Sequence, residues 1–172
     1  MANTPQRFLE KIREAKEKKL KQLDLSNSYR ELAFVHEKLT EIPAKVFEDE
    51  FAFDGEKLTE IPAEVFEDKL AFDGEKLTEI PSEVFELEWL EILDLSDNEL
   101  TKLPDEIASL QYLTTLDLRD NQLTTLPEAI SGLQQLTTLD LRDNQLTTLP
   151  EAISGLQQLT TLDLRDNQLT TL

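Results

Sequence analysis

The chain has 172 residues, of which 39% are hydrophobic and 31% charged, as expected for a folded globular protein. Its net charge of −19 argues against nucleic acids and anionic membranes as partners, because both bind positively charged surfaces. The absence of cysteine excludes disulfides, thiol catalysis and thiolate metal sites. No apolar run reaches the ~20 residues that span a bilayer, and the start does not resemble a signal peptide, so the expected location is the cytoplasm.

Residues 1–22 are expected to form a basic capping helix. This stretch contains seven Lys or Arg residues and three Glu residues, so the rest of the chain is even more acidic than the whole. Thr4-Pro5 is typical of a helix start. An apolar stripe at helical spacing follows, formed by Phe8, Leu9, Ile12, Ala15 and Leu20. We interpret the basic side chains as a solvated helix face, and we expect any partner selected by charge to be basic.

Residues 23–89 contain short, irregular repeats. The heptapeptide EKLTEIP begins at Glu37, Glu56 and Glu75, a period of 19 residues. We interpret these segments as stacked short repeats; hairpins that turn at Asp54-Gly55 and Asp73-Gly74 are the alternative. Leu23 and Leu25 indicate a strand, and residues 22–35 are expected to form an N-terminal hairpin unless one of its two segments is a loop.

Residues 90–172 contain regular repeats of 23 residues. Residues 113–135 and 136–158 are identical, residues 90–112 are a looser copy, and residues 159–172 begin another. Their shared frame is L-x-x-L-x-L-x-x-N-x-L-x-x-L-P-x-x-I-x-x-L-x-x. Leucines two positions apart indicate a strand with one buried face, and the Ile and Leu that follow the Pro indicate a returning segment that fills the core. One such repeat cannot bury its own apolar face, so stability should come from stacking on neighbours.

This frame resembles the leucine-rich-repeat family, in particular repeats of bacterial and Roco-type proteins and of Ras-binding scaffold proteins. The resemblance is close over residues 90–172 and loose over residues 20–89. It implies an α/β-type repeat solenoid in one continuous domain, a right-handed superhelix with a parallel β-sheet on its concave face and an N-terminal helical cap. It also implies that Asn98, Asn121, Asn144 and Asn167 form a stacked ladder of side-chain amides; separate turn-forming asparagines are the alternative.

No catalytic constellation is recognisable in the sequence. The single histidine, His36, is expected in an exposed turn, and no serine has a histidine partner at an interpretable spacing. No glycine-rich phosphate-binding loop occurs. Carboxylate pairs recur in every repeat, whereas an active site is normally unique. The sequence therefore predicts no enzymatic activity, no metal and no cofactor.

The concave face is the predicted partner-binding surface, because its outward side chains form columns across strands that lie ~4.8 Å apart. The candidate residues are Asp94, Ser96, Thr115, Asp117, Arg119, Asp120, Thr138, Asp140, Arg142, Asp143, Thr161, Asp163, Arg165 and Asp166. They either anchor a basic partner or neutralise one another and keep the face soluble. The second interpretation is favoured, because no aromatic hot-spot residue points from this face. Trp89 and Tyr112 are expected to pack on the back side.

The sequence thus indicates a non-catalytic scaffold for protein–protein interaction. The alternatives are an engineered repeat protein without a natural partner, or the repeat arm of a larger multidomain GTPase or other enzyme. The last repeat stops part-way, so we expect an uncovered apolar layer formed by Leu159, Leu162, Leu164, Leu169 and Leu172. A homodimer paired through this end is one expected consequence, and a monomer with a frayed last turn is the other.

Overall fold

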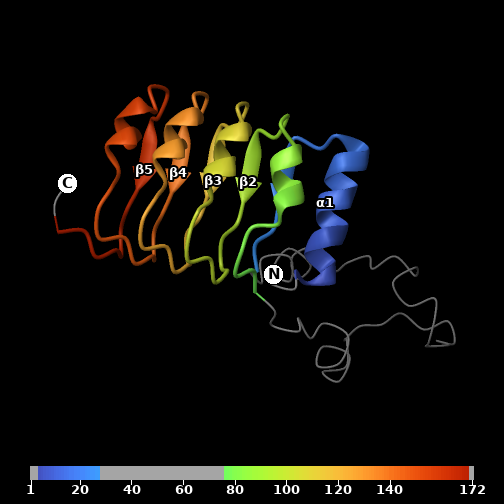
Figure 1. Cartoon of the computed structure of the whole chain (residues 1–172), viewed down its shortest axis with the longest axis horizontal. Coiled ribbons are helices and arrows are strands. Elements are labelled where there is room, and N and C mark those ends of the chain that lie inside the picture. Colours follow the sequence, from blue (N-terminus) through green and yellow to red (C-terminus); the bar gives the residue numbers. More distant parts are fainter. Residues whose placement is uncertain (1–3, 28–75, 171–172) are drawn as a thin grey trace, which may run out of the picture. The chain divides into compact units, whose positions relative to one another are not determined.

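The computed structural model describes residues 4–27 and 76–170, which belong to one compact unit (Figure 1). One α-helix, α1 (Gln6–Lys18), precedes the first strand. The strands are β1 (Gln22–Asp24), β2 (Ile92–Asp94), β3 (Thr115–Asp117), β4 (Thr138–Asp140) and β5 (Thr161–Asp163). Short 3-10 helices alternate with them: η2 (Ser82–Glu86), η3 (Asp105–Ser109), η4 (Glu128–Gly132) and η5 (Glu151–Gly155).

The five strands form one parallel sheet in the order β1-β2-β3-β4-β5. Successive regular repeats pair in the same register, so that Leu93, Leu116, Leu139 and Leu162 are aligned across the sheet. We name each repeat after its strand: the β2 repeat is 90–112, the β3 repeat is 113–135 and the β4 repeat is 136–158. The β5 repeat begins at residue 159. This arrangement confirms the predicted repeat solenoid with a parallel sheet and a helical N-terminal cap.

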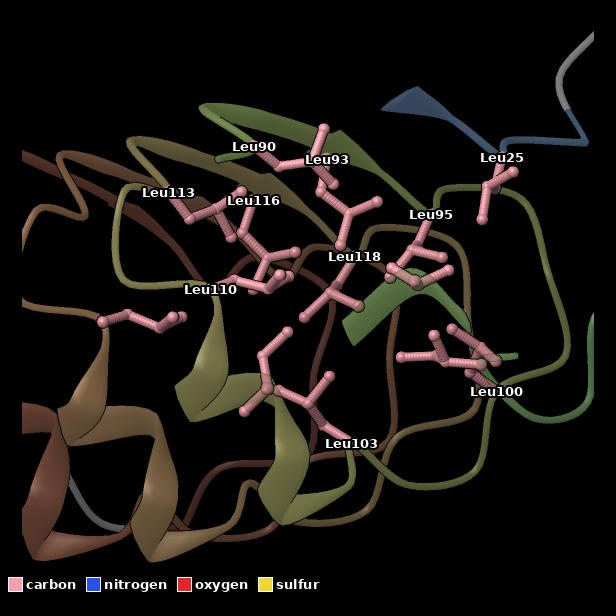
Figure 2. Packing of buried hydrophobic residues seen from close by; sticks show 14 of the residues in the cluster. Leu25, Leu90, Leu93, Leu95, Leu100, Leu103, Leu110, Leu113, Leu116 and Leu118 are labelled. Atoms are coloured by element: carbon pink, nitrogen blue, oxygen red, sulfur yellow. The ribbon is translucent and has the colours of Figure 1, made fainter. Parts of the chain in front are cut away.

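The core lies between the sheet and the 3-10 helices (Figure 2). Leu93, Leu95, Leu116 and Leu118 enter it from the strand side, and all four are fully buried. Ile107, Leu110, Ile130 and Leu133 are also fully buried and enter from the returning side, as predicted. Each fully buried leucine contributes roughly 1.5–3 kcal/mol relative to an exposed one, so stacked leucine layers account for most of the cohesion between repeats.

The 3-10 helices begin directly after prolines, whose fixed φ and missing N–H suit the start of a helix. The helices of the β2 and β3 repeats pack closely at Gly132. A Cβ atom at this position would lie 2.7 Å from the Cβ of Ala108, so a larger residue would push η4 away from η3.

Helix α1 covers the β1 end of the core with Phe8, Ile12 and Ala15, which are buried as predicted. Lys19 caps the end of the helix: it adopts the left-handed conformation and donates its backbone N–H to the carbonyl of Ala15. Two details differ from the expectation. The helix starts after Pro5 without a side-chain capping bond, so Thr4 is not its N-cap. Leu20, assigned to the apolar stripe, lies beyond the helix and is 38% exposed. None of the described helices is long and apolar enough to cross a membrane.

Strand β1 pairs in parallel with β2, and Leu23 is aligned with Leu93. We expected the short repeats to stack between the cap and the regular repeats, but the neighbour of β2 on this side is β1. Of the predicted hairpin at 22–35, residues 22–27 are described and contain β1, which pairs in parallel with β2. The rest of that hairpin, the two short repeats that begin at Glu37 and Glu56, and His36 lie outside the described residues.

Candidate interaction surface

The outward side chains of the sheet form what we call the strand face: three columns of aligned residues. The parallel register places them in rows ~4.8 Å apart. The first column contains Gln22, Ile92, Thr115, Thr138 and Thr161. The second contains Asp24, Asp94, Asp117, Asp140 and Asp163. The third follows two residues later, with Ser26, Ser96, Arg119, Arg142 and Arg165. The β1 members were missed in the sequence, although the run LDLS at 23–26 repeats at 93–96.

At the β4 and β5 end of the strand face, each aspartate is paired with the arginine of its own repeat. Arg142 donates from Nε to Oδ1 of Asp140 at 2.9 Å and from Nη2 to Oδ2 at 2.7 Å. Arg165 binds Asp163 in the same way, at 2.9 and 2.6 Å. Arg142 also lies 3.3 Å from Asp163 and so links the two repeats. The hydrogen bond from Arg165 lowers the pKa of Asp163 to about 2. Opposite charges therefore neutralise one another at this end.

At the β1 and β2 end, serine replaces the arginine. The hydroxyl groups of Ser26 and Ser96 donate to Asp24 and Asp94, each at 2.7 Å. Ser96 is completely buried, which corrects its assignment to the exposed face, because its short side chain folds back onto Asp94. A hydroxyl group carries no charge, so it satisfies a hydrogen bond of the carboxylate without cancelling its negative charge. No ion pair to Asp24 or Asp94 occurs within residues 4–27 and 76–170.

Asp117 lies where the two ends of the strand face meet. Its side chain is 19% exposed, and the guanidinium group of Arg119 lies 3.4 Å away. The backbone N–H of Arg119 donates to Oδ1 of Asp117 at 3.2 Å. Burial, followed by the negative charge of Asp94, raises the pKa of Asp117 to about 6, and Arg119 only partly offsets these effects. The strand face therefore has an acidic end formed by Asp24, Asp94 and Asp117, and a neutralised end on β4 and β5.

The aspartates that follow the third column, of which Asp120, Asp143 and Asp166 are candidate residues, have a backbone role. Asp97, Asp120, Asp143 and Asp166 have φ values of 58°, 54°, 53° and 56°. This left-handed conformation is uncommon for residues other than glycine, and aspartate and asparagine tolerate it best. These residues turn the chain out of each strand, which the sequence assignment as surface residues did not foresee.

The asparagines form the predicted amide ladder. Asn121 donates from Nδ2 to the carbonyl of Leu95 in the previous repeat at 3.0 Å, and to those of Leu118 and Arg119 in its own repeat. Its Oδ1 accepts the backbone N–H of Leu100 at 3.0 Å. Asn98, Asn144 and Asn167 make the same four kinds of bond. The ladder thus satisfies backbone groups that would otherwise be buried without a partner.

A second ladder, of threonines, was missed in the sequence. The hydroxyl of Thr114 donates to the carbonyl of Glu91 at 2.8 Å, Thr137 donates to Thr114 at 2.9 Å, and Thr160 donates to Thr137 at 3.0 Å. The 23-residue recurrence of Thr was its only signal. Both ladders hold neighbouring repeats together and leave the outward positions of the strands free to vary.

The back-side aromatic residues differ from each other. Trp89 packs against the core and donates from Nε1 to the carbonyl of Leu20 at 3.1 Å, as predicted for a packing residue. Tyr112 is 65% exposed, so its predicted packing role is wrong. Within the described part of the chain, no group of His, Asp or Glu residues is arranged to hold a metal ion.

The model of the leucine-rich-repeat family matches residues 68–123 and 111–169, which together span more than half of the chain. A solved leucine-rich-repeat protein of Leptospira interrogans is 44% identical, with a TM-score of 0.55 over 56% of this chain and 25% of that one. The BIR3–SERK2 complex of Arabidopsis thaliana matches at 38% identity, with a TM-score of 0.49 over 54% of this chain and 51% of that one.

An internalin of Listeria monocytogenes is 30% identical, with a TM-score of 0.48 over 56% of this chain and 28% of that one. The chain therefore spans between a quarter and about half of the length of these structures. No curated protein sequence matches it significantly.

Proposed function

Because this chain belongs to the leucine-rich-repeat family, we propose that it is a non-catalytic scaffold that binds a protein partner across its strand face. The observation that carries this proposal is the uneven charge of that face. Asp24 and Asp94 are bonded to serines and Asp117 has the more distant Arg119 at 3.4 Å, whereas Asp140 and Asp163 are bound by arginines at 2.7 and 2.6 Å. The first three therefore form an acidic end. A partner that supplies positive charge gains most at the acidic end.

The proposed ligand is a basic segment of polypeptide that lies across β1, β2 and β3. A Lys or Arg side chain above Asp94 and Asp117 would provide the counter-charge that the serines do not supply. Burial is the main cause of the raised pKa of Asp117 and the negative charge of Asp94 is the second; a bound cation would offset this second effect. Such complementarity favours selectivity and fast association more than high affinity.

The neutralising interpretation of the sequence fits the other end of the strand face. Arg142 and Arg165 are already engaged by aspartates of the same face, so they offer little to an acidic or basic partner. Asp140 and Asp163 then maintain solubility, and the binding role falls to a subset of the candidate residues.

Binding of a lysine- and arginine-rich peptide tests the proposal, with a glutamate-rich peptide of equal length as the negative probe. We expect fluorescence anisotropy to show binding of the basic peptide alone, weakened by salt because exposed charges are screened beyond ~8–10 Å. Asp94→Asn should lower the affinity about three- to fivefold, as expected for the loss of one partly exposed charge pair of up to ~1 kcal/mol.

Asp163→Asn is the matched control, since Asp163 occupies the same column but is paired with Arg165. We expect it to leave the affinity for the basic peptide unchanged or slightly lower. Equal binding of both peptides, or equal effects of the two substitutions, would contradict an acidic binding site on β1–β3.

Self-association is a second candidate role, favoured by one observation in the β5 repeat. Leu162 is 38% exposed, whereas the equivalent Leu139 is fully buried beneath the next repeat. A second copy that covers Leu162 would remove this apolar surface from water. Sedimentation equilibrium should then show a dimer that Leu162→Lys converts to a monomer. An unchanged monomer at high micromolar concentration would exclude this role.

A further inference from the structure

Contacts between neighbouring repeats follow a fixed sequence spacing, with one exception at β1. Leu93 and Leu116 are paired across 23 positions, whereas Leu23 and Leu93 are paired across 70. On the returning side of the solenoid, the segment that contains Leu77 is again one regular interval from its neighbour. Glu99 donates its backbone N–H to Leu77 at 2.9 Å, across 22 positions, and Gln122 donates to Leu100 across the same interval. The excess of 47 residues therefore falls between β1 and Leu77.

The hydrogen bonds of Asn98 narrow the range in which the 47 additional residues lie. Its Nδ2 donates to the carbonyl of Leu25 and its Oδ1 accepts the N–H of Leu77, both at 2.9 Å. The equivalent groups bound by Asn121 belong to Leu95 and Leu100, which are only five positions apart. Leu25 and Leu77 are 52 positions apart, so the same excess of 47 residues lies between them. The Asn98 side chain thus joins two segments that are distant in the sequence, in the way that Asn121 joins two parts of a single repeat.

The two segments complete each other in the core. Leu23 and Leu25 occupy the positions of Leu93 and Leu95, and they are 3% and 0% exposed. The returning segment contributes buried apolar residues at the positions that the β2 repeat fills with Leu100, Leu103, Ile107 and Leu110; these residues are Leu77, Ile80, Val84 and Leu87. Trp89 closes the repeat through its bond to Leu20. Residues 20–27 and 75–89 together number 23, one full repeat.

We propose that residues 20–27 and 75–89 are a single leucine-rich repeat interrupted by an insertion, residues 28–74, and that the solenoid closes without the insertion. The sequence of residues 28–74 supports their interpretation as an insertion. It contains two 19-residue segments, 37–55 and 56–74, which begin with the heptapeptide EKLTEIP that also begins the returning segment at Glu75. The turn after β1 is therefore a position where this fold accepts additional chain without a change in the stacking of its repeats.

Amide hydrogen exchange on the full chain tests whether residues 20–27 and 75–89 are held together by Asn98. The Leu77 amide should be protected, since it is bonded to Asn98. Asn98→Ala should accelerate its exchange at least tenfold and leave Leu100 protected, whereas Asn121→Ala should expose Leu100 and leave Leu77 protected. The inference would be overturned if the Leu77 amide exchanged as fast as a free amide in the parent chain, or if Asn98→Ala left its exchange rate unchanged.

A deletion of residues 28–74, which joins Asn27 to Glu75, tests the insertion itself. We expect cooperative thermal unfolding with a midpoint at or above that of the full chain, because a direct connection closes at a lower entropic cost than a long one. The matched control removes an equal length, residues 24–70, and so deletes Leu25 together with Asn27. It should lose the protection of the Leu77 amide. Loss of cooperative unfolding in the first deletion would overturn the proposal.

Discussion

The two ends of the strand face share one backbone, and the residue of the third column decides the difference in their charge. On β1 and β2 the aspartate accepts a hydrogen bond from Ser26 or Ser96, and on β4 and β5 it is paired with Arg142 or Arg165. The strand register is the same throughout. The charge of the surface is thus decided independently of the fold.

This independence has a structural cause. The inward leucines and the asparagine and threonine ladders satisfy the demands of the backbone inside the solenoid. In each repeat the backbone N–H of the third-column residue donates to Oδ1 of the aspartate, whether that residue is serine or arginine. The same backbone therefore accommodates either side chain in the third column. A surface of this kind acquires its binding preference from single positions, and it is tested by changing them.

Asn121→Ala tests the shared backbone and should have the largest effect. It removes the Asn121 bonds to the carbonyls of Leu95 and Leu118 and to the N–H of Leu100, while the carbonyl of Arg119 keeps the N–H of Asp97. We expect a loss of about 3 kcal/mol in the free energy of unfolding in urea. Gln122→Ala is the control, because Gln122 is adjacent and exposed. Equal costs for the two substitutions would show that the ladder does not hold the repeats together.

The substitution Ser26→Arg should reduce the difference between the two ends. Ser26 is partly exposed, whereas Ser96 is buried, so the new arginine can pair with Asp24 as Arg142 does with Asp140. We expect the affinity for the basic peptide to fall about three- to fivefold, as for the loss of one partly exposed charge pair of up to ~1 kcal/mol. The reciprocal Arg119→Ser should increase it, since it removes the positive charge beside Asp117. Unchanged affinity in Ser26→Arg would refute the assignment of the site.

Asp117→Asn tests the meeting point of the two ends through pH. The pKa of Asp117 is raised to about 6 from an ordinary 3.8, so the folded state holds its proton more tightly than the unfolded state. Stability should therefore be greatest below about pH 4 and should fall as the pH rises through about 6. At pH 7 the Asn variant should be more stable by about 1 kcal/mol, a value reduced for solvent screening.

At about pH 3, below the ordinary pKa of 3.8, the Asn variant and the parent should have the same stability, because Asp117 is then protonated in both the folded and most of the unfolded population. Its charged neighbours Asp94, Asp140 and Arg119 are unchanged in this comparison. An Asn variant that is less stable than the parent at pH 7 would show that Arg119 outweighs burial.

Arg165→Ala should have the smallest effect on stability. The Arg165 side chain is 69% exposed, and exposed ion pairs contribute little. We expect no measurable change in the thermal midpoint at pH 7. The pKa of Asp163, measured by NMR, should rise from about 2 towards its ordinary value, since its hydrogen bond to Arg165 is lost. Any contribution of the pair is present above the ordinary pKa and lost as the pH falls through about 2. Exposure of Arg165 keeps this contribution small, and a clearly destabilised variant at neutral pH would contradict that expectation.

The sequence by itself determined the parts of the molecule that repeat. A 23-residue period places Leu116 and Leu139 at equivalent positions, and stacking identical units requires a parallel sheet in constant register. The recurrence of Asn at a fixed place after each strand predicted the amide ladder correctly. The columns of the strand face followed from the same period, because alternate residues of a strand point to one side.

The features that do not follow the 23-residue period could be determined only from the tertiary structure. Three copies of EKLTEIP are equivalent in the sequence, and local pattern cannot show that the third, at Glu75, completes the repeat begun by β1. That choice depends on contacts across 70 positions, among them the bonds from Asn98 to Leu25 and Leu77. The burial of Ser96, the left-handed turn at Asp97 and the exposure of Tyr112 likewise follow from packing between repeats, which a one-dimensional pattern does not contain.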